Sequence, residues 1–201
     1  MEIQILKKIT FRELEEKIRT IPLMKKDEQG NEIFPYRNAY MVLRNFRPEE
    51  VNPPTFYLLR RNLEIQQALH DSLQQQGYDS LSLDEKVAAL ELVNKDTGEI
   101  WTLTPPIIEM TLRTVRYVPQ EREINYENNS VSIMIPLICD GAHRVALSHE
   151  KNRWFKGLFI SGADPDYPYY AHPNGWDQVH IVDNVPNTKL EKKLYRLEDC
   201  Y

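Results

Sequence analysis

Cysteine is scarce in this chain, and its scarcity excludes two classes of protein. Only Cys139 and Cys200 are present among 201 residues, and neither belongs to a CxxC pair. A cysteine-based metal finger or a disulfide framework needs more cysteines at closer spacing. The chain must therefore fold around an ordinary hydrophobic core, and it is long enough to do so.

Long apolar runs are also missing. No stretch approaches the roughly 18 consecutive apolar residues of a membrane span. Residues 1–8 lack the apolar segment of a secretory signal peptide. These absences predict a cytoplasmic protein with no membrane partner.

The chain has no excess of basic residues. It carries 25 Lys and Arg against 30 Asp and Glu, a formal net charge of −5. Non-specific binding of DNA or RNA depends on positive charge, so DNA is a partner that the charge disfavours without excluding it. The basic clusters at 59–61 and 189–196 have acidic neighbours, which is typical of solvated helix faces.

What the chain does have is a mixture of helical and extended patterns, which predicts an α+β fold. Thr10 and Glu13 form a capping box that opens a helix at residue 11. Gly77 is placed to end a second helix over 57–76. A hairpin is expected over 21–34, and strands are expected at 39–43, 107–117, 131–135, 137–139, 155–160 and 178–182.

In two further segments the sequence leaves a helix–strand boundary open or predicts a broken strand. The capping-box form of Ser82–Glu85 favours a helix through Leu90, whereas the turn at 94–98 favours a strand at 99–102, and the boundary over 90–93 is open. The strands at 107–117 and 131–135 are predicted to be the arms of a long β-hairpin with a polar tip at 121–130. Pro136 is expected to interrupt the returning arm.

One short motif stands between an apolar run ending at Cys139 and a helix-like segment over 145–150. We call it the DGAHR turn, and it consists of Asp140, Gly141, Ala142, His143 and Arg144. A strand that turns through glycine into a helix leaves backbone N–H groups unpaired. Such a helix start binds anions, usually phosphates, so the DGAHR turn is the candidate site.

The order of motifs around this turn resembles the N-terminal domain of the ParB/sulfiredoxin superfamily. The resemblance covers Phe46 to Ser161 and rests on Phe46–Val51, the helix end at 69–73 with Gly77, the strand at 106–108, the DGAHR turn and the strand at 156–160. It implies a mixed sheet with helices packed on it, here with an N-terminal extension and the long hairpin as an insertion. We therefore divide the chain into an extension (1–45), a ParB/sulfiredoxin-like domain (46–185) and a C-terminal helix (186–201).

The resemblance also implies a nucleotide whose phosphates lie on the DGAHR turn. Sulfiredoxins need a cysteine where this chain has Ala142, and Cys139 lies three residues too early, inside the strand. Partitioning ParB proteins carry a GERR turn instead. The free-serine kinase branch uses the same DGxHR pattern, and this similarity implies ATP or another nucleotide with Mg²⁺. It also places Glu64 as general base, by its distance from Gly77.

Each residue of the candidate site has a structural alternative. Asp140 either caps the helix or binds Mg²⁺ near the phosphates. His143 either donates to a phosphate oxygen or is a neutral core histidine. Arg144 either binds phosphate bidentately or pairs with a carboxylate. Gly141 and Ala142 offer the phosphate their backbone.

Other residues have weaker assignments. Trp176, in an aromatic and proline-rich segment, either stacks on the substrate as part of a lid or packs on the sheet as part of a connector. His149 is expected to be solvated. Glu109 and Asp183 are either additional acids of the site or exposed acids at strand ends.

Three functions follow from these assignments. The first is a phosphotransferase acting on a small hydroxyl acceptor, or a nucleotidase, with Asp140, His143 and Glu64 as catalytic residues. The second is a non-catalytic nucleotide sensor. The third is a DNA-associated module, which the acidic charge disfavours.

Overall fold

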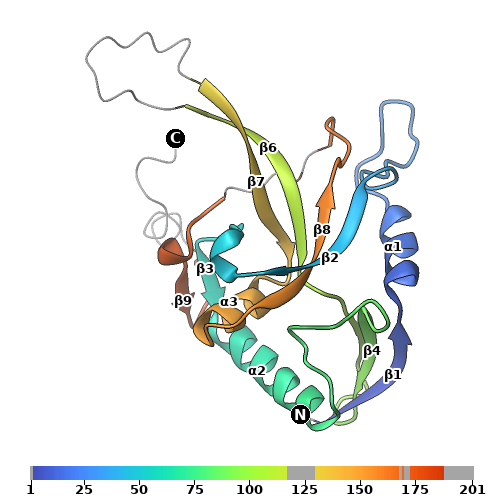
Figure 1. The fold of residues 1–201 in the computed structure, drawn as a ribbon, viewed down its shortest axis with the longest axis vertical. Coiled ribbons are helices and arrows are strands. Elements are labelled where there is room, and N and C mark those ends of the chain that lie inside the picture. Colours follow the sequence, from blue (N-terminus) through green and yellow to red (C-terminus); the bar gives the residue numbers. More distant parts are fainter. Residues whose placement is uncertain (1, 117–129, 168, 170–172, 188–201) are drawn as a thin grey trace.

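The computed structural model describes residues 2–116, 130–167, 169 and 173–187 of the chain. Figure 1 shows the arrangement of the elements. Their bounds are β1 (Ile3–Ile9), α1 (Phe11–Arg19), β2 (Tyr40–Phe46), the 3₁₀ turn η1 (Pro48–Glu50), β3 (Tyr57–Leu59), α2 (Arg60–Gln75), β4 (Ala89–Asn94), β5 (Ile100–Leu103), β6 (Ile107–Arg116), β7 (Ser130–Asp140), α3 (Ala142–Glu150), β8 (Phe155–Ser161), the 3₁₀ turn η2 (Trp176–Gln178) and β9 (His180–Val182).

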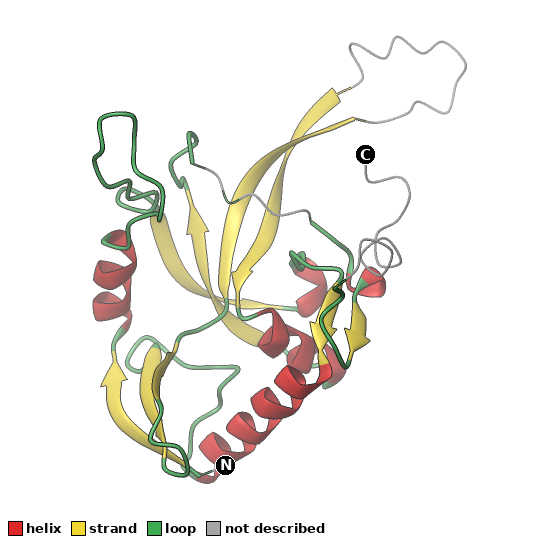
Figure 2. Cartoon of the chain, turned by 180° about the vertical axis from the view of Figure 1, so that it is seen from behind, coloured by secondary structure: helices red, strands yellow, loops and turns green. Residues whose placement is uncertain are grey.

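The central sheet is mixed, as the sequence predicts. Its strand order is β2-β8-β6-β7, and β6 and β8 are parallel while the other neighbours are antiparallel. A smaller antiparallel sheet has the order β1-β4-β5, and β3 pairs with β9 in parallel. The α+β class is therefore confirmed. The hairpin β6–β7 projects from the end of the molecule opposite α2 (Figures 1 and 2).

The two faces of the central sheet are covered by different elements. Alternation along β8 directs Phe155 to a core with α3 and η1, and directs Leu158 and Ile160 to a core with α1. A third core lies between α2 and the small sheet, around Leu73 and Leu90. Because β1 pairs with β4 and α1 packs against β8, residues 3–19 share their cores with the rest of the chain.

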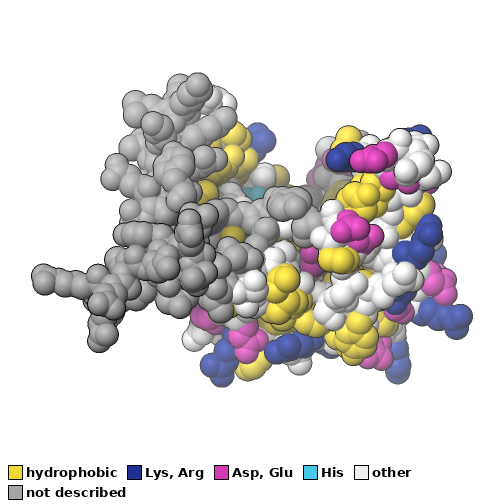
Figure 3. All heavy atoms as spheres, turned by 90° about the horizontal axis from the view of Figure 1, so that it is seen from above, with side chains coloured by type: hydrophobic (Ala, Val, Ile, Leu, Met, Phe, Trp, Pro, Cys, Tyr) yellow, Lys and Arg dark blue, Asp and Glu magenta, His cyan; other side chains and the backbone are white. Residues whose placement is uncertain are grey.

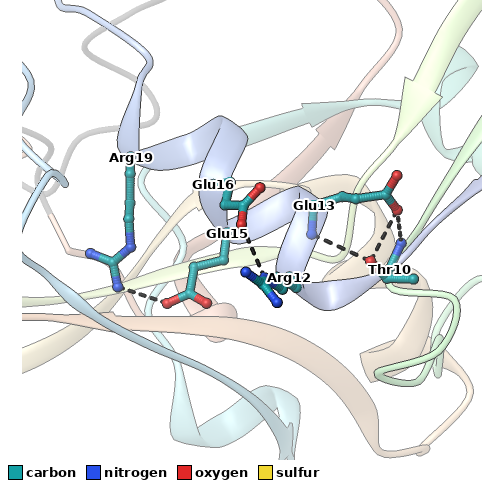
Figure 4. Close-up of polar contacts among 6 residues, drawn as sticks. All are labelled: Thr10, Arg12, Glu13, Glu15, Glu16 and Arg19. Carbon is teal, nitrogen blue, oxygen red and sulfur yellow. Dashed lines mark hydrogen bonds and ion pairs between the residues drawn. The ribbon is translucent and has the colours of Figure 1, made fainter.

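Helix α1 begins where the sequence predicts, at a complete capping box (Figure 4). The Thr10 hydroxyl accepts from the Glu13 backbone N–H at 3.3 Å, and the Glu13 carboxylate accepts from the Thr10 backbone N–H at 2.8 Å. Arg12–Glu16 and Glu15–Arg19 pairs, each four residues apart, lie along the same helix. Local signals therefore set the start of this helix and support its exposed face, and its buried face packs against β8.

Several other sequence expectations are confirmed. Gly77 has a φ of +81°, and the Tyr78 N–H donates to the Leu73 carbonyl at 2.9 Å, which is the glycine-terminated helix end that the sequence indicates. The strands expected at 39–43, 99–102 and 155–160 correspond to β2, β5 and β8. The tip of the long hairpin and the C-terminal helix at 186–201 fall largely outside the described residues.

The predicted helix after Ser82 is wrong. Asp84 accepts hydrogen bonds from the backbone N–H groups of Lys86 (2.9 Å) and Val87 (3.0 Å), forming a turn instead of a helix start. The chain then enters β4, where Ala89 and Leu90 are fully buried in consecutive positions. A strand paired on both sides and packed on both faces has no polar side, so its pattern does not alternate.

The hairpin predicted over 21–34 is confirmed in part, and the predicted break at Pro136 is wrong. Within 21–34 the two arms face each other, because Lys26 and Glu32 form an antiparallel bridge and the Leu23 N–H donates to the Ile33 carbonyl at 2.8 Å, but neither arm forms a strand. Pro136 does not interrupt β7, which runs unbroken to Asp140. The Pro136 carbonyl accepts from the Asn52 N–H at 2.9 Å, on the side of β7 away from β6. The nitrogen and carbonyl of a strand residue face the same side, so the Pro136 nitrogen also faces away from β6 and no β6–β7 hydrogen bond is lost. Proline is tolerated at this edge strand for that reason.

Four elements have no counterpart in the sequence expectations: strands β1 and β3 and the 3₁₀ turns η1 and η2. Strand β3 occupies the first three residues of the expected helix over 57–76. The strand expected at 178–182 begins at His180, because η2 ends at Gln178.

Candidate functional site

The DGAHR turn has the predicted strand-turn-helix form. Strand β7 ends at Asp140, Gly141 precedes the helix with a φ of +84°, and α3 begins at Ala142. A Cβ on Gly141 would lie 2.9 Å from the Pro106 Cα and 3.0 Å from a terminal nitrogen of Arg144. Glycine is required here twice over, by the left-handed backbone and by the closeness of Pro106.

Among the described residues, no side chain caps the start of α3. The backbone N–H groups of Ala142 and His143 therefore have no carbonyl acceptor within the helix. The predicted capping role of Asp140 is wrong, because Gly141 occupies the cap position. Instead, the Asp140 carboxylate accepts from the Thr104 hydroxyl at 3.4 Å, and its side chain is 60% exposed. The first N–H groups of α3 therefore have no side-chain acceptor among the described residues, as in helix starts that bind anions.

Arg144 lies under the turn. Its side chain is 7% exposed, it donates to the Thr104 carbonyl, and one of its nitrogens lies 3.7 Å from the Asp140 carboxylate. Burial lowers the pKa of Arg144, and the nearby Asp140 opposes that shift. The predicted alternative of a carboxylate partner is therefore observed, and the guanidinium supports the turn from within the protein.

His143 has an unusual environment. Its Nε2 atom is buried and has no hydrogen-bond partner among the described residues. Burial lowers the pKa of His143, so the imidazole is neutral at pH 7. An orphaned buried nitrogen costs about 1–3 kcal/mol. Burial fits the core-histidine alternative, while a missing partner fits the phosphate alternative, so both remain open.

Glu64 lies apart from the DGAHR turn. It is exposed on α2, at a pocket of about 390 Å³ between α2 and α3. Two residues of α3, Leu147 and Glu150, line this pocket, and no residue of the DGAHR turn lines it. The role of Glu64 as general base stays a prediction.

Trp176 is held by the protein on two sides. Its indole N–H lies 2.7 Å from the Pro48 carbonyl and 3.2 Å from that of Val51. Its ring stacks on His149, with 5.5 Å between centroids and 17° between planes. These contacts match the connector alternative, because Trp176 packs against the core that Val51 and α3 share with the central sheet. Substrate binding by Trp176 stays a prediction.

Glu109 is the residue that the sequence reasoning misjudged. It is 2% exposed in the middle of the central sheet. Its carboxylate accepts from the Tyr36 hydroxyl at 2.7 Å, from the Tyr169 backbone N–H at 3.3 Å and from the Thr111 hydroxyl at 3.3 Å. The expectation of an exposed strand-end acid is therefore wrong. The contact with Tyr36 spans 73 residues, and no local sequence signal could have shown it.

Cys139 lies in β7 as predicted, next to Glu109. Its sulfur is 3.9 Å from a Glu109 carboxylate oxygen. Burial, followed by the charge of Glu109, raises the pKa of the Cys139 thiol. A protonated thiol is a poor nucleophile, which agrees with the absence of a sulfiredoxin-type cysteine in the DGAHR turn.

A metal ion at this site would depend on ligands beyond the protein. Within the described ranges, no group of three or more His, Cys, Asp or Glu side chains could hold a metal ion. Asp140 is a single exposed carboxylate, and Mg²⁺ is commonly held by one or two carboxylates together with substrate phosphates. As for the membrane, none of the described helices is long and apolar enough to cross a bilayer.

The family model of the ParB CE domain matches residues 13–180. The chain belongs to the ParB CE domain family. The predicted ParB resemblance is thus confirmed, and the match begins within the predicted N-terminal extension. No curated protein and no solved structure matches the chain. The free-serine kinase branch remains an expectation based on the DGAHR turn.

Proposed function

We propose that this ParB-family chain binds a nucleotide by its phosphates at the DGAHR turn and transfers the terminal phosphoryl group to a small hydroxyl acceptor or to water. The observation that supports this proposal is that, among the described residues, the start of α3 has no side-chain cap and the Nε2 of His143 in its first turn has no hydrogen-bond partner. Backbone N–H groups and a neutral imidazole are donors suited to phosphate oxygens.

The other residues of the turn have distinct roles in this proposal. The Asp140 carboxylate, exposed and directly before the helix, would hold Mg²⁺ against the phosphates. Mg²⁺ would supply neutralisation of the charge on the phosphates. Arg144 would act as a positioning residue, because it holds Asp140 and the Thr104 carbonyl from the buried side.

The proton acceptor is less well supported than the phosphate site. Glu64 lies beside Leu147 and Glu150, about one and two turns beyond the start of α3. An acceptor hydroxyl would have to reach the phosphates from that pocket for Glu64 to take its proton. If water replaces the acceptor, the same site describes a nucleotidase.

A non-catalytic nucleotide sensor is the second candidate. The stacking of Trp176 on His149 favours it, because α3 thereby connects the DGAHR turn to η2. A ligand at one end of α3 could change the packing at the other end. A DNA-associated function has less support. The chain is acidic, and basic and acidic side chains are interspersed on the described part seen in Figure 3.

A thermal-shift panel of nucleoside triphosphates with Mg²⁺ tests the site. We expect specific stabilisation of the wild type that is reduced in His143→Gln and in Asp140→Asn and retained in His180→Gln, an exposed histidine on β9. Arg144→Ala is a poor probe, because it removes a buried side chain that supports the turn. The absence of a shift with any nucleotide would overturn the proposal.

The release of ADP, measured with a panel of small hydroxyl acceptors, tests the chemistry. Turnover that disappears in His143→Gln, while circular dichroism shows an intact fold, supports phosphotransfer. Saturable binding without any turnover would refute phosphotransfer and leave the sensor function. A salt-sensitive gel shift on plasmid DNA would revive the third function.

A further inference from the structure

A second pocket lies away from the DGAHR turn, between the loop after α1 and the segment after β8. Its volume is about 510 Å³, in the range of small-molecule sites. Three tyrosines line it, namely Tyr36, Tyr167 and Tyr169, with Leu23 and Pro35 beside them. The Asp164 N–H donates to the Pro35 carbonyl at 2.9 Å and so joins the two segments, which lie side by side in Figures 1 and 2.

A buried carboxylate lies directly behind these tyrosines. The Tyr36 hydroxyl donates to Glu109 at 2.7 Å, and the Tyr169 backbone N–H donates to the other carboxylate oxygen at 3.3 Å. Two of the three tyrosines are thereby fixed in position by the same group. In the part of the chain that the structure describes, no Lys, Arg or His forms an ion pair with Glu109.

The electrostatics of this arrangement favour positive charge. A carboxylate in a buried site acts over a longer range than one in water, and a phenol that donates to a carboxylate has a more electron-rich ring. Burial, followed by Glu109, raises the pKa of Tyr36. Burial also raises the pKa of Tyr169, as do Cys139, Glu109 and Asp140. Tyr36 and Tyr169 are therefore neutral phenols near the carboxylate of Glu109.

We propose that this pocket binds the ammonium or quaternary ammonium group of a small cationic ligand. The cation would lie against the tyrosine rings, with Glu109 behind them and Asp166 at the rim. Cation–π contact of this kind is the established chemistry for recognising such groups. Lys25 also lines the pocket, and its charge opposes a cation there. This site is separate from the proposed nucleotide site, and either proposal can fail alone.

The decisive comparison uses choline and its uncharged isostere, 3,3-dimethylbutan-1-ol. Isothermal titration calorimetry with the wild type, at ionic strength matched with sodium chloride, measures both. We expect choline to bind about tenfold more tightly, a difference of about 1.4 kcal/mol. Equal affinity for the two compounds, or no binding of choline, would overturn the proposal.

Matched variants test whether the preference for choline arises in this pocket. Tyr167→Leu should remove the preference for choline, whereas Tyr167→Phe, which keeps an aromatic ring, should retain it. Glu109→Gln should weaken choline binding without changing the binding of the isostere, and Lys25→Gln should strengthen choline binding. If Glu109→Gln does not fold, the Tyr167 pair and Lys25→Gln still decide the question. A preference for choline that survives Tyr167→Leu and ignores Lys25→Gln would place the cation elsewhere and refute this assignment.

Discussion

Replacing Gly141 by alanine is the most direct test of the geometry of the DGAHR turn. Gly141 has a φ of +84°, and a Cβ there would lie 2.9 Å from the Pro106 Cα. Pro106 cannot move away cheaply, because its carbonyl accepts from the Leu158 N–H at 2.8 Å at the start of β6. The substitution therefore combines backbone strain with a backbone clash.

The two contributions can be separated by a control. Left-handed backbone costs a non-glycine residue about 1–2 kcal/mol, and overpacking costs about 1–3 kcal/mol. We expect Gly141→Ala to lower the free energy of unfolding by about 2–5 kcal/mol. Gly30 has a φ of +85°, and a Cβ there would have no heavy atom of the described residues within 4 Å, so Gly30→Ala carries the strain alone.

Urea denaturation followed by circular dichroism measures both variants under the same conditions. The difference between them should be about 1–3 kcal/mol, the contribution of the clash with Pro106. Equal losses in the two variants would show that β6 and the DGAHR turn are not packed as described. The proposed phosphate-binding site at the DGAHR turn would then lose its structural basis.

Three further measurements test other parts of the structure. Thr10→Ala should destabilise the protein by about 1 kcal/mol in urea denaturation, because it removes the cap of α1. Burial lowers the pKa of both His70 and His143, so the unfolded chain binds more protons than the folded one, and stability should fall as the pH drops below about 6.5. Urea midpoints at pH 7.5 and 5.5 measure that loss, which should be smaller in His143→Gln, and an unchanged loss would contradict the burial of this ring. Trp176→Phe should cost about 1–2 kcal/mol, because it leaves the Pro48 and Val51 carbonyls without the indole donor, and a thermal melt that matches the wild type would count against that contact.

Local chemistry made some features predictable. The capping box at Thr10, the helix end at Gly77 and the DGAHR turn each depend on residues a few positions apart, and all three appear in the structure. In β4, by contrast, partners from β1 and β5 override a helix-like start. Tertiary pairing of this kind leaves little trace in a local pattern.

In the candidate site, too, the local features were predictable and the tertiary contacts were not. The position of the turn followed from the sequence, but the burial of Arg144 depends on Thr104, 40 residues earlier. The burial of Glu109 depends on Tyr36, 73 residues earlier. Whether a charged side chain faces water or the interior was decided in both cases by a distant partner.

The pairing of β3 with β9 has a consequence for the synthesis of the chain. Tyr57 pairs with His180, and the adjacent Arg60–Asp183 ion pair joins residues 123 positions apart. At about 5–20 residues per second, a ribosome needs roughly 6–25 s to cover that interval. Strand β3 and the start of α2 therefore leave the ribosome that much earlier than their partner. Trp176 is synthesised only shortly before β9, so the apolar surface around Val51 also stays exposed until then. The nascent chain therefore exposes an unpaired strand edge for seconds, which is the interval in which chaperone binding or aggregation would compete with folding.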